Sequence, residues 1–317
     1  MIDRLRRPEA GGQTAAAGIG LAILTALVSG VSVWVNASAV RAVGDPILFT
    51  TLKNGVAAVL LVAIAAVLVD RAPARIADLR GRDRLGLVTL GIIGGSVPFV
   101  LFFSGLASAS APSAALIHKT LFVWVALLAA LLLRERLGVL QLAALGVLVV
   151  GQLLVQPADG LAWTSGETMI AVATGLWAIE VVIARRLLAE VPAPLAAASR
   201  MGLGLVVLIG WTAIDGRLDG IGALGAEQWA WIAATGMLLT AYVSGWYAAL
   251  RRAPASAVTA VLTIGAPITA GIQLVADGRV PAPEALVGYA GIFAAAALIG
   301  WVALSTSRSA STASATG

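Results

Sequence analysis

Long apolar segments follow one another along almost the whole chain, and each has about the length of a helix that crosses a bilayer. Such a helix needs about 20 mainly apolar residues. Of the 317 residues, 60% are hydrophobic and 12% are charged, whereas in soluble domains roughly a quarter are charged. The pattern predicts an all-α integral membrane protein with ten transmembrane helices. They are expected at approximately Ala15 to Ala39, Pro46 to Val69, Leu85 to Leu106, Ala111 to Leu133, Leu137 to Val155, Glu167 to Leu188, Pro194 to Ile214, Ala226 to Leu250, Ala255 to Ala276 and Ala285 to Ser305.

The basic residues predict how the chain is oriented. With the N-terminus inside, fifteen of the 21 lysines and arginines fall on the cytoplasmic side and three on the outer side, and the other three lie within the spans. An excess of lysine and arginine marks cytoplasmic loops, so we expect both termini in the cytoplasm and an even number of crossings. Because these charges are scattered over short loops, nucleic acid is not an expected partner.

The two halves of the sequence echo each other, as the openings of matching spans show. Pro46 precedes Lys53 and Gly55, while Pro194 precedes Arg200 and Gly202 at similar offsets. Five helices per half is an odd number, so the halves are expected to be inverted repeats, a transporter architecture with its binding site near the midplane. The expected organisation is a cytoplasmic tail at 1–14, repeats at 15–155 and 167–305, a periplasmic linker at 156–166 and a disordered cytoplasmic tail at 306–317.

Three short motifs resemble a known family. They are Ser-Ala-Ser-Ala-Pro-Ser-Ala-Ala-Leu from Ser108 to Leu116, Leu-Leu-Leu-Arg-Glu-Arg-Leu from Leu131 to Leu137, and Gln-Leu-Ala-Ala-Leu-Gly from Gln141 to Gly146. With the five-helix halves, they are similar to the EamA family of the drug/metabolite transporter superfamily. The resemblance implies a ten-helix permease of the bacterial inner membrane, with a cavity lined by the first, third, fourth, sixth, eighth and ninth helices. Many members export amino acids or other small metabolites.

The counterpart of Glu135 in the second half is open. Glu135 stands eleven residues before Gly146, and Asp277 stands eleven before Gly288. Counting forward from Pro267 instead leads to the vicinity of Val280, so the two counts disagree.

Basic side chains inside the spans are the first candidates for a binding site. A cation at membrane depth is costly, and it persists mainly where it faces a partner, a bundle interior or an aqueous pathway. We expect Lys119 to bind a carboxylate of the substrate; the alternative is a structural cation paired with a carbonyl or with Glu180. His118 either packs or relays a proton. Lys53 and Arg200 either line the site or extend to the nearest interface.

Glu180 is the one carboxylate expected within a span, and two interpretations of it are open. It carries a coupling proton, as buried acids do in transporters, or it is the counter-ion of a cation on a neighbouring helix. Three interior cations against one acid favour an anionic or zwitterionic substrate, such as an amino acid. The alternative is export of cationic drugs or quaternary ammonium compounds, which would need an unpaired acid in an aromatic cage, with Trp177 as one wall.

Three tryptophans lie deeper in the spans than the helix ends. An aromatic belt at the membrane interface explains tryptophans near helix ends but does not account for these three. Trp124, Trp177 and Trp246 either wall the cavity or face lipid. The glycines and the proline between Gly91 and Pro98 predict close helix packing and a kink, and Pro267 predicts another.

Few other function classes fit the sequence. The chain has no cysteine, one histidine and no phosphate-binding Gly-rich motif, so neither an enzyme nor a metal or other cofactor is expected. We expect a secondary transporter that works by alternating access, with a small molecule, the lipid bilayer and protons as partners. A passive channel or a membrane scaffold is the other alternative. The direction of transport, the coupling ion and the oligomeric state are left open.

Overall fold

The computed structural model describes residues 11–70, 76–106, 108–157 and 163–315, and these residues contain helices but no strand. The first half of the chain forms α1 (Gly11–Val43), α2 (Pro46–Leu68), α4 (Gly81–Gly95), α5 (Val97–Leu106), α6 (Ala111–Lys119), α7 (Leu121–Leu132) and α8 (Val139–Val155). The second half forms α9 (Ser165–Leu187), α10 (Ala193–Ile214), the 3-10 helix η2 (Arg217–Ala223), α11 (Ala226–Arg252), α12 (Ala255–Leu262), α13 (Gly265–Asp277) and α14 (Pro283–Ala315).

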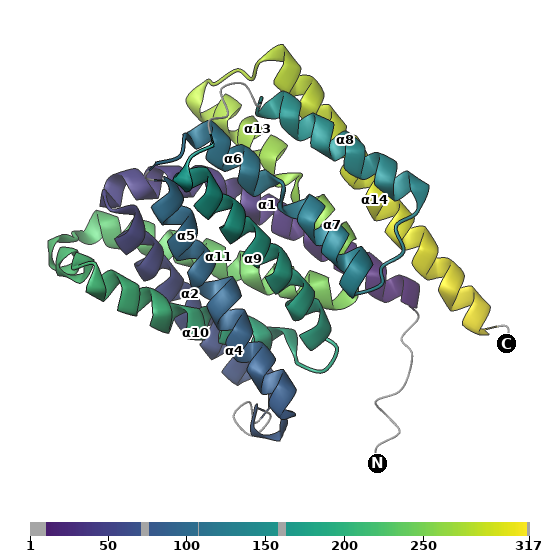
Figure 1. The fold of residues 1–317 in the computed structure, drawn as a ribbon, viewed down its shortest axis with the longest axis horizontal. Coiled ribbons are helices and arrows are strands. Elements are labelled where there is room, and N and C mark those ends of the chain that lie inside the picture. The colour runs from purple at the N-terminus through teal and green to yellow at the C-terminus, as the bar shows by residue number, and fades with distance from the viewer. Residues whose placement is uncertain (1–10, 71–75, 107, 158–162, 316–317) are drawn as a thin grey trace.

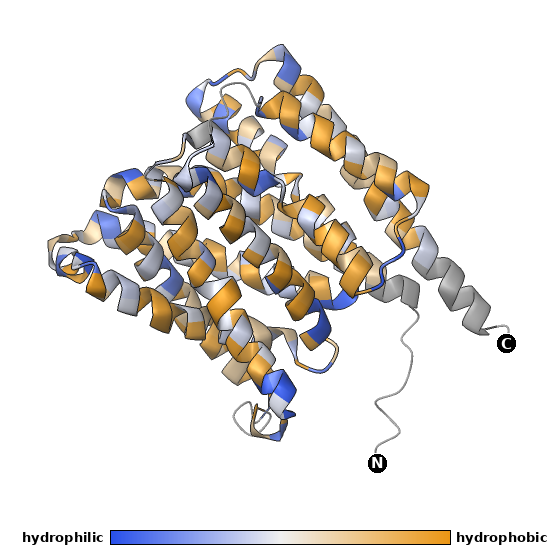
Figure 2. Cartoon of the chain, in the orientation of Figure 1, coloured by the Kyte–Doolittle hydropathy of each residue, from blue (hydrophilic) through white to orange (hydrophobic). Residues whose placement is uncertain are grey.

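The helices have the length and composition of membrane spans. Among the described residues, eight helical segments are long and apolar enough to cross a membrane, and the apolar helix α8 is shorter, with 17 residues. The 27-residue helix α11 is outside this set, and it carries tyrosines, tryptophans and threonines among its apolar residues. Apolar side chains such as Val67 and Ile214 are more than 80% exposed, which suits a surface that faces lipid. Hydrophilic residues gather at the loops and helix ends (Figure 2). The structure is therefore that of a multi-pass membrane protein, and the number of ten crossings stays a prediction.

The two halves pack together in matching pairs of helices. The second helices, α2 and α10, pack on each other, and so do the last helices, α8 and α14, which lie side by side along one edge (Figure 1). The first helix of each half packs against the third span of the other, as α1 against α11 and α9 against α5. It also packs against the fourth span of the other half, as α1 against α13 and α9 against α7. These contacts between the halves thus have counterparts with the halves exchanged, whereas the contact of α1 with α14 is not matched by a comparable contact of α9 with α8 among the described residues.

Three of the spans are interrupted within the membrane. The kink expected between Gly91 and Pro98 lies at Ser96, whose hydroxyl donates to the carbonyls of Gly91 and Ile92. The fourth span of each half breaks at a threonine. The hydroxyl of Thr120 donates to the carbonyl three residues earlier at 2.6 Å, and that of Thr263 does the same at 2.6 Å. Because side chains satisfy local carbonyls there, the helix can be interrupted in an apolar environment.

The two ends of the chain differ from the predicted tails. α1 begins at Gly11, before the expected Ala15, while residues 1–10 lie outside the described part. α14 continues to Ala315, so among the described residues the helix runs past 306, where the sequence predicts a disordered tail. Extending an existing helix needs no new nucleus, and alanine is the best helix former, which explains how a segment rich in Ala, Ser and Thr stays helical. The predicted linker at 156–166 lies partly outside the described residues, at 158–162.

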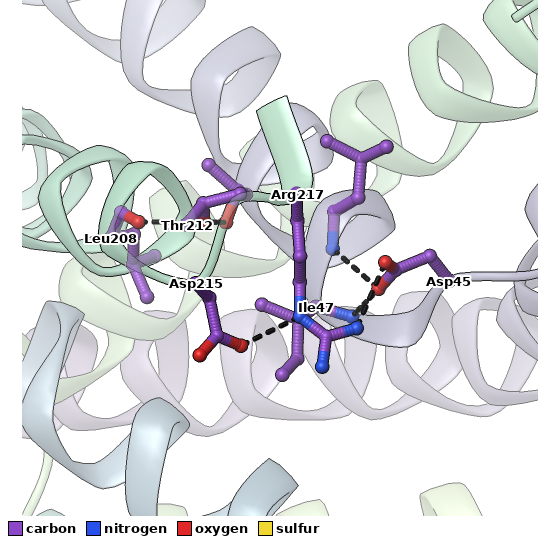
Figure 3. A network of polar contacts seen from close by, with 8 residues as sticks. Asp45, Ile47, Leu208, Thr212, Asp215 and Arg217 are labelled. Carbon is purple, nitrogen blue, oxygen red and sulfur yellow. Dashed lines mark hydrogen bonds and ion pairs between the residues drawn. The ribbon is translucent and has the colours of Figure 1, made fainter. Parts of the chain in front are cut away.

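One end of the α2 and α10 pair is closed by a polar network around Asp45 (Figure 3). Asp45 caps α2, accepting hydrogen bonds from the backbone of Ile47 and Leu48 at 2.9 and 3.1 Å. Arg217 of η2 donates to Asp45 at 2.9 Å and to Asp215 at 2.7 Å. Partial burial by itself raises the pKa of Asp45, but these hydrogen bonds and the charge of Arg217 outweigh it and leave the pKa below its ordinary value of 3.8.

Replacing Asp45 by alanine is expected to lower stability at neutral pH by about 1 kcal/mol, the usual effect of losing a helix cap. A carboxyl whose pKa is lowered by folding stabilises the protein above its ordinary pKa and loses that effect as pH falls through the lowered value. The difference in melting temperature between wild type and Asp45→Ala should therefore be largest near pH 7 and shrink below pH 3.8. Asp45→Asn, which keeps an acceptor for the cap, should lose less. A difference that is independent of pH would contradict this account.

Candidate substrate-binding site

Lys119 is the last residue of α6, directly before the break at Thr120, and it is half-buried. Within the described ranges, no carboxylate lies within ion-pair distance of it. Lys53 of α2 also has no acidic partner there. Its amine donates to the side-chain oxygen of Asn36 on α1 at 3.2 Å and lies 5.2 Å above the centre of the Phe49 ring. Two of the three predicted interior cations therefore have no acidic partner among the described residues.

The third cation, Arg200, forms an ion pair with Glu180. Arg200 Nε of α10 lies 3.4 Å from Glu180 Oε1 of α9, and their side chains are only 11% and 3% exposed. The hydroxyl of Tyr247 on α11 donates to the same carboxylate oxygen at 2.6 Å. Arg200 thus points to an acid in the protein interior rather than extending to the interface, and Glu180 has the position of a counter-ion.

A glycine on α4 makes room for this ion pair. A Cβ on Gly94 would come within 2.5 Å of Glu180 Cγ and within 3.0 Å of Arg200 Nε. The carbonyl of Gly94 also accepts a hydrogen bond from the indole of Trp177 at 3.2 Å. The buried acid, its cation and the tryptophan are therefore held together on the surface of α4.

Aromatic rings from two helices, α5 and α6, gather around Trp177 of α9. Its ring centroid lies 5.2 Å from that of Phe99, 5.7 Å from Phe102 and 5.1 Å from His118. His118 also packs edge-on against Phe102 at 5.3 Å. Its buried Nδ1 has no hydrogen-bond partner within the part of the chain that the structure describes. His118 and Trp177, two predicted site residues, thus lie together beside Lys119.

The other two predicted tryptophans have different surroundings. Trp246 is 7% exposed, and its ring is stacked on that of Tyr242 with centroids 6.4 Å apart. Trp124 is 48% exposed on α7, and its indole donates to the hydroxyl of Thr120 on the same helix span at 3.2 Å. The structure does not bring Trp124 together with the other site residues, because its position on α7 points it away from the packed interior.

Two carboxylates join the halves at the starts of the interrupted helices. Glu135 accepts from the backbone of Ala255 at 2.7 Å and of Ser256 at 3.2 Å, at the start of α12, and from the Ser256 hydroxyl at 2.5 Å. Glu167 of α9 accepts from the backbone of Ser110, which caps α6, at 3.2 Å. Each half therefore supplies an acid to the fourth span of the other.

The turn that presents Glu135 is strained. Arg134 has φ 57°, a left-handed conformation that is uncommon for residues other than glycine. Asp277, one proposed counterpart of Glu135, has a different contact, since it accepts from the indole of Trp34 at 3.1 Å. In the contacts of the fold, Glu167 is the acid that matches Glu135.

Several of these residues were not among the sequence candidates. Tyr247 and Phe99 carry no charge, and Glu167 stands at a predicted helix start, where an acid is ordinary. Their roles depend on which helices pack together. A signal was available only for Gly94, which belongs to the glycine-rich stretch of the third span.

Comparison with known proteins identifies the family. The profile of the EamA-like transporter family matches residues 16–156 and 164–301. A solved structure, titled only as the crystal structure of a protein, is 18% identical; the alignment covers 89% of this chain and 97% of that one, with a TM-score of 0.68, which shows that the two share a fold. No curated protein matches the sequence. The chain, which consists of two EamA repeats, therefore belongs to the EamA-like transporter family.

Proposed function

We propose that the protein is a secondary transporter of a small anionic or zwitterionic metabolite, such as an amino acid, and that Lys119 binds the substrate's carboxylate. The observation that carries the proposal is the distribution of charge. Glu180 is neutralised by Arg200, whereas Lys119 and Lys53 have no acidic partner among the described residues. Because an unpaired cation at membrane depth is costly, a substrate carboxylate is the ligand that would offset the cost.

The position of Lys119 supports the same proposal. Broken helices at matching positions of the two halves mark the binding site in many transporter folds. Lys119 stands at such a break, and α12 and α13 are interrupted at the matching place. The rings of Trp177 and His118 then form an aromatic wall beside the carboxylate site.

Cationic drugs fit these contacts less well. A quaternary ammonium site needs an acid whose charge is free. The Glu180 carboxylate already accepts from Tyr247 and pairs with Arg200, and the Trp177 ring contacts phenylalanines and His118. Of the two candidates for a coupling proton, we therefore favour His118, whose Nδ1 has no partner in the described residues, over Glu180.

The reciprocal contacts of Glu135 and Glu167 suit alternating access. With both termini in the cytoplasm of a bacterial cell and the repeats inverted, Glu135 would lie near the inner face of the membrane and Glu167 near the outer face. The start of α1 and the end of α14 lie at the same end of the molecule (Figure 1), as this orientation requires. Opening the site to one side of the membrane would then break the contact of Glu135 or of Glu167 on that side, while the contact on the other side is kept.

Lys119→Met should weaken binding of carboxylate ligands by about ten- to a hundredfold, because a hydrogen bond to a charged group contributes about 1.5–3 kcal/mol. The measurement is the rise in melting temperature of the purified protein with amino acids, carboxylates and quaternary ammonium ions, since a ligand that binds only the folded state stabilises it. Lys119→Arg should keep part of the effect, and Arg41→Met, which removes an exposed cation at the end of α1, should keep all of it.

Two results would oppose the proposal. One is carboxylate stabilisation that is equal in wild type and Lys119→Met. The other is stabilisation by quaternary cations that is lost in Glu180→Gln, which would favour drug export. Uptake of the binding ligand into vesicles, with and without an imposed pH gradient, distinguishes a transporter from a scaffold and tests proton coupling.

A further inference from the structure

Two buried polar side chains on α2 have no hydrogen-bond partner among the described residues. Asn54 is completely buried, and both its side-chain oxygen and its side-chain nitrogen are unpaired. Thr50 is 2% exposed, and its hydroxyl is also unpaired. Residues four apart lie on one face of a helix, so the two side chains lie next to each other. Together, the Asn54 carboxamide and the Thr50 hydroxyl offer two acceptor oxygens, one N–H donor group and one O–H donor on the same face of α2.

The other polar groups of this helix have partners. The hydroxyl of Thr51 lies 2.7 Å from that of Thr212 on α10, and Lys53 donates to Asn36 on α1. The unpaired groups therefore lie on the face of α2 between its α1 side and its α10 side. Because an unpaired polar group in an apolar interior is expensive, nearly all such groups in proteins have a partner, either in the protein, in water or in a ligand.

Thr50 is connected to the candidate site through a row of aromatic rings. Thr50 lines a small pocket between α2, α5 and α10, and Phe99 is part of the α5 wall of that pocket. The Phe99 ring packs against Trp177 at 5.2 Å, and Trp177 packs against His118 at 5.1 Å. A row of contacting rings thus leads from the pocket at Thr50 to the residue beside Lys119.

We infer that Thr50 and Asn54 form a second part of the substrate site, which hydrogen-bonds an uncharged hydroxyl or carboxamide group of the substrate. A carboxamide and a hydroxyl both donate and accept, and the ligand group that complements them does the same. This inference rests on the proposed function, because it concerns the substrate whose carboxylate binds Lys119. The substrate class is then a polar amino acid or hydroxy acid rather than an apolar one.

The test uses pairs of ligands of similar shape that differ in one polar group. They are L-threonine with L-valine, L-asparagine with L-leucine, and malate with succinate. The melting temperature of the purified full-length protein is measured as each ligand is added. In wild type the polar member of at least one pair should bind at least tenfold more tightly, because a site built for a hydrogen-bonding group rejects an analogue that lacks it.

Asn54→Leu and Thr50→Val should each remove most of this preference. Each change should weaken binding of the polar ligand and leave binding of its apolar counterpart unchanged. Thr89→Val is the matched control, because within the described part of the chain the Thr89 hydroxyl bonds only to the carbonyl of Leu85 in its own helix. Using both variants keeps the test valid where one of them fails to fold.

The outcomes separate this inference from the proposed function. If both variants keep the preference and melt at or above the wild-type temperature, Thr50 and Asn54 hold at most internal water, and the inference is overturned. If carboxylates bind through Lys119 without any preference for the polar member, the inference also fails while the proposed function stands. If no carboxylate stabilises even the wild type, the proposed function is wrong, and the inference, which depends on it, is wrong as well.

Discussion

Replacing Arg200 by methionine is expected to destabilise the protein by about 3–5 kcal/mol, because the change leaves a buried carboxylate without its cation. The partner acid Glu180 has a side chain only 3% exposed, and its remaining neighbour, the hydroxyl of Tyr247, is neutral. The loss should appear as a melting temperature well below that of wild type in the same detergent.

The double variant Arg200→Met with Glu180→Gln should recover much of this loss, since removing both charges leaves none unpaired in the interior. Arg217→Met is the control, because Arg217 pairs with Asp45 at the surface, where ion pairs contribute about 1 kcal/mol or less. The account is wrong if Arg200→Met and Arg217→Met lower the melting temperature equally. It is also wrong if the double variant is as unstable as Arg200→Met alone.

Gly204→Ala should disrupt the crossing of α4 and α10, with a loss of about 3 kcal/mol. A Cβ at this position would lie 2.5 Å from the carbonyl oxygen of Gly95 and 2.6 Å from its Cα. Both are backbone atoms, which cannot turn aside as a side chain can, so the helices must separate. Overpacking usually costs about 1–3 kcal/mol, and contacts with rigid backbone belong at the upper end.

Gly210→Ala is the matched control for this change. Gly210 lies six residues further along α10, it is exposed, and a Cβ there meets no atom within 4 Å. In a helix interior alanine is favoured over glycine by about 1 kcal/mol, so Gly210→Ala should be neutral or stabilising. Melting temperature and the monodisperse fraction after purification distinguish the two variants. Equal behaviour of Gly204→Ala and Gly210→Ala would show that the crossing tolerates a side chain.

The sequence was a good guide to the helices, because hydropathy acts locally. Each predicted span coincides with one helix or with two consecutive helices, and the third, fourth and ninth spans are the divided ones. The kink at Ser96 was foreshadowed by glycine and proline, whereas the breaks at Thr120 and Thr263 rest on one hydroxyl each and had no comparable signal. Beyond residue 306 the helix α14 continues where the sequence predicts disorder, because the composition of the tail permits a helix as well as disorder.

The candidate site was only partly accessible from the sequence. A charged side chain in an apolar span has a high free-energy cost, and this alone indicated Lys119, Lys53, Arg200 and Glu180 as candidates without any knowledge of the fold. It did not reveal that Glu180 belongs with Arg200 and Tyr247, because those contacts join residues 20 and 67 positions apart on three different helices. Asn54 went unnoticed for a related reason: an asparagine in a span is unremarkable until its neighbours are known.

The crossed contacts of Glu135 and Glu167 have a consequence for biosynthesis. When the first half has entered the membrane, the backbone amide of Ser110 at the start of its α6 still lacks the carboxylate that it bonds in the finished protein, because Glu167 has not yet been made. The second half in turn depends on Glu135 of the first for the start of α12. Neither half contains all the hydrogen-bond partners of its own fourth span. The first repeat therefore enters the membrane before its contacts are complete, and the two repeats complete their folding together.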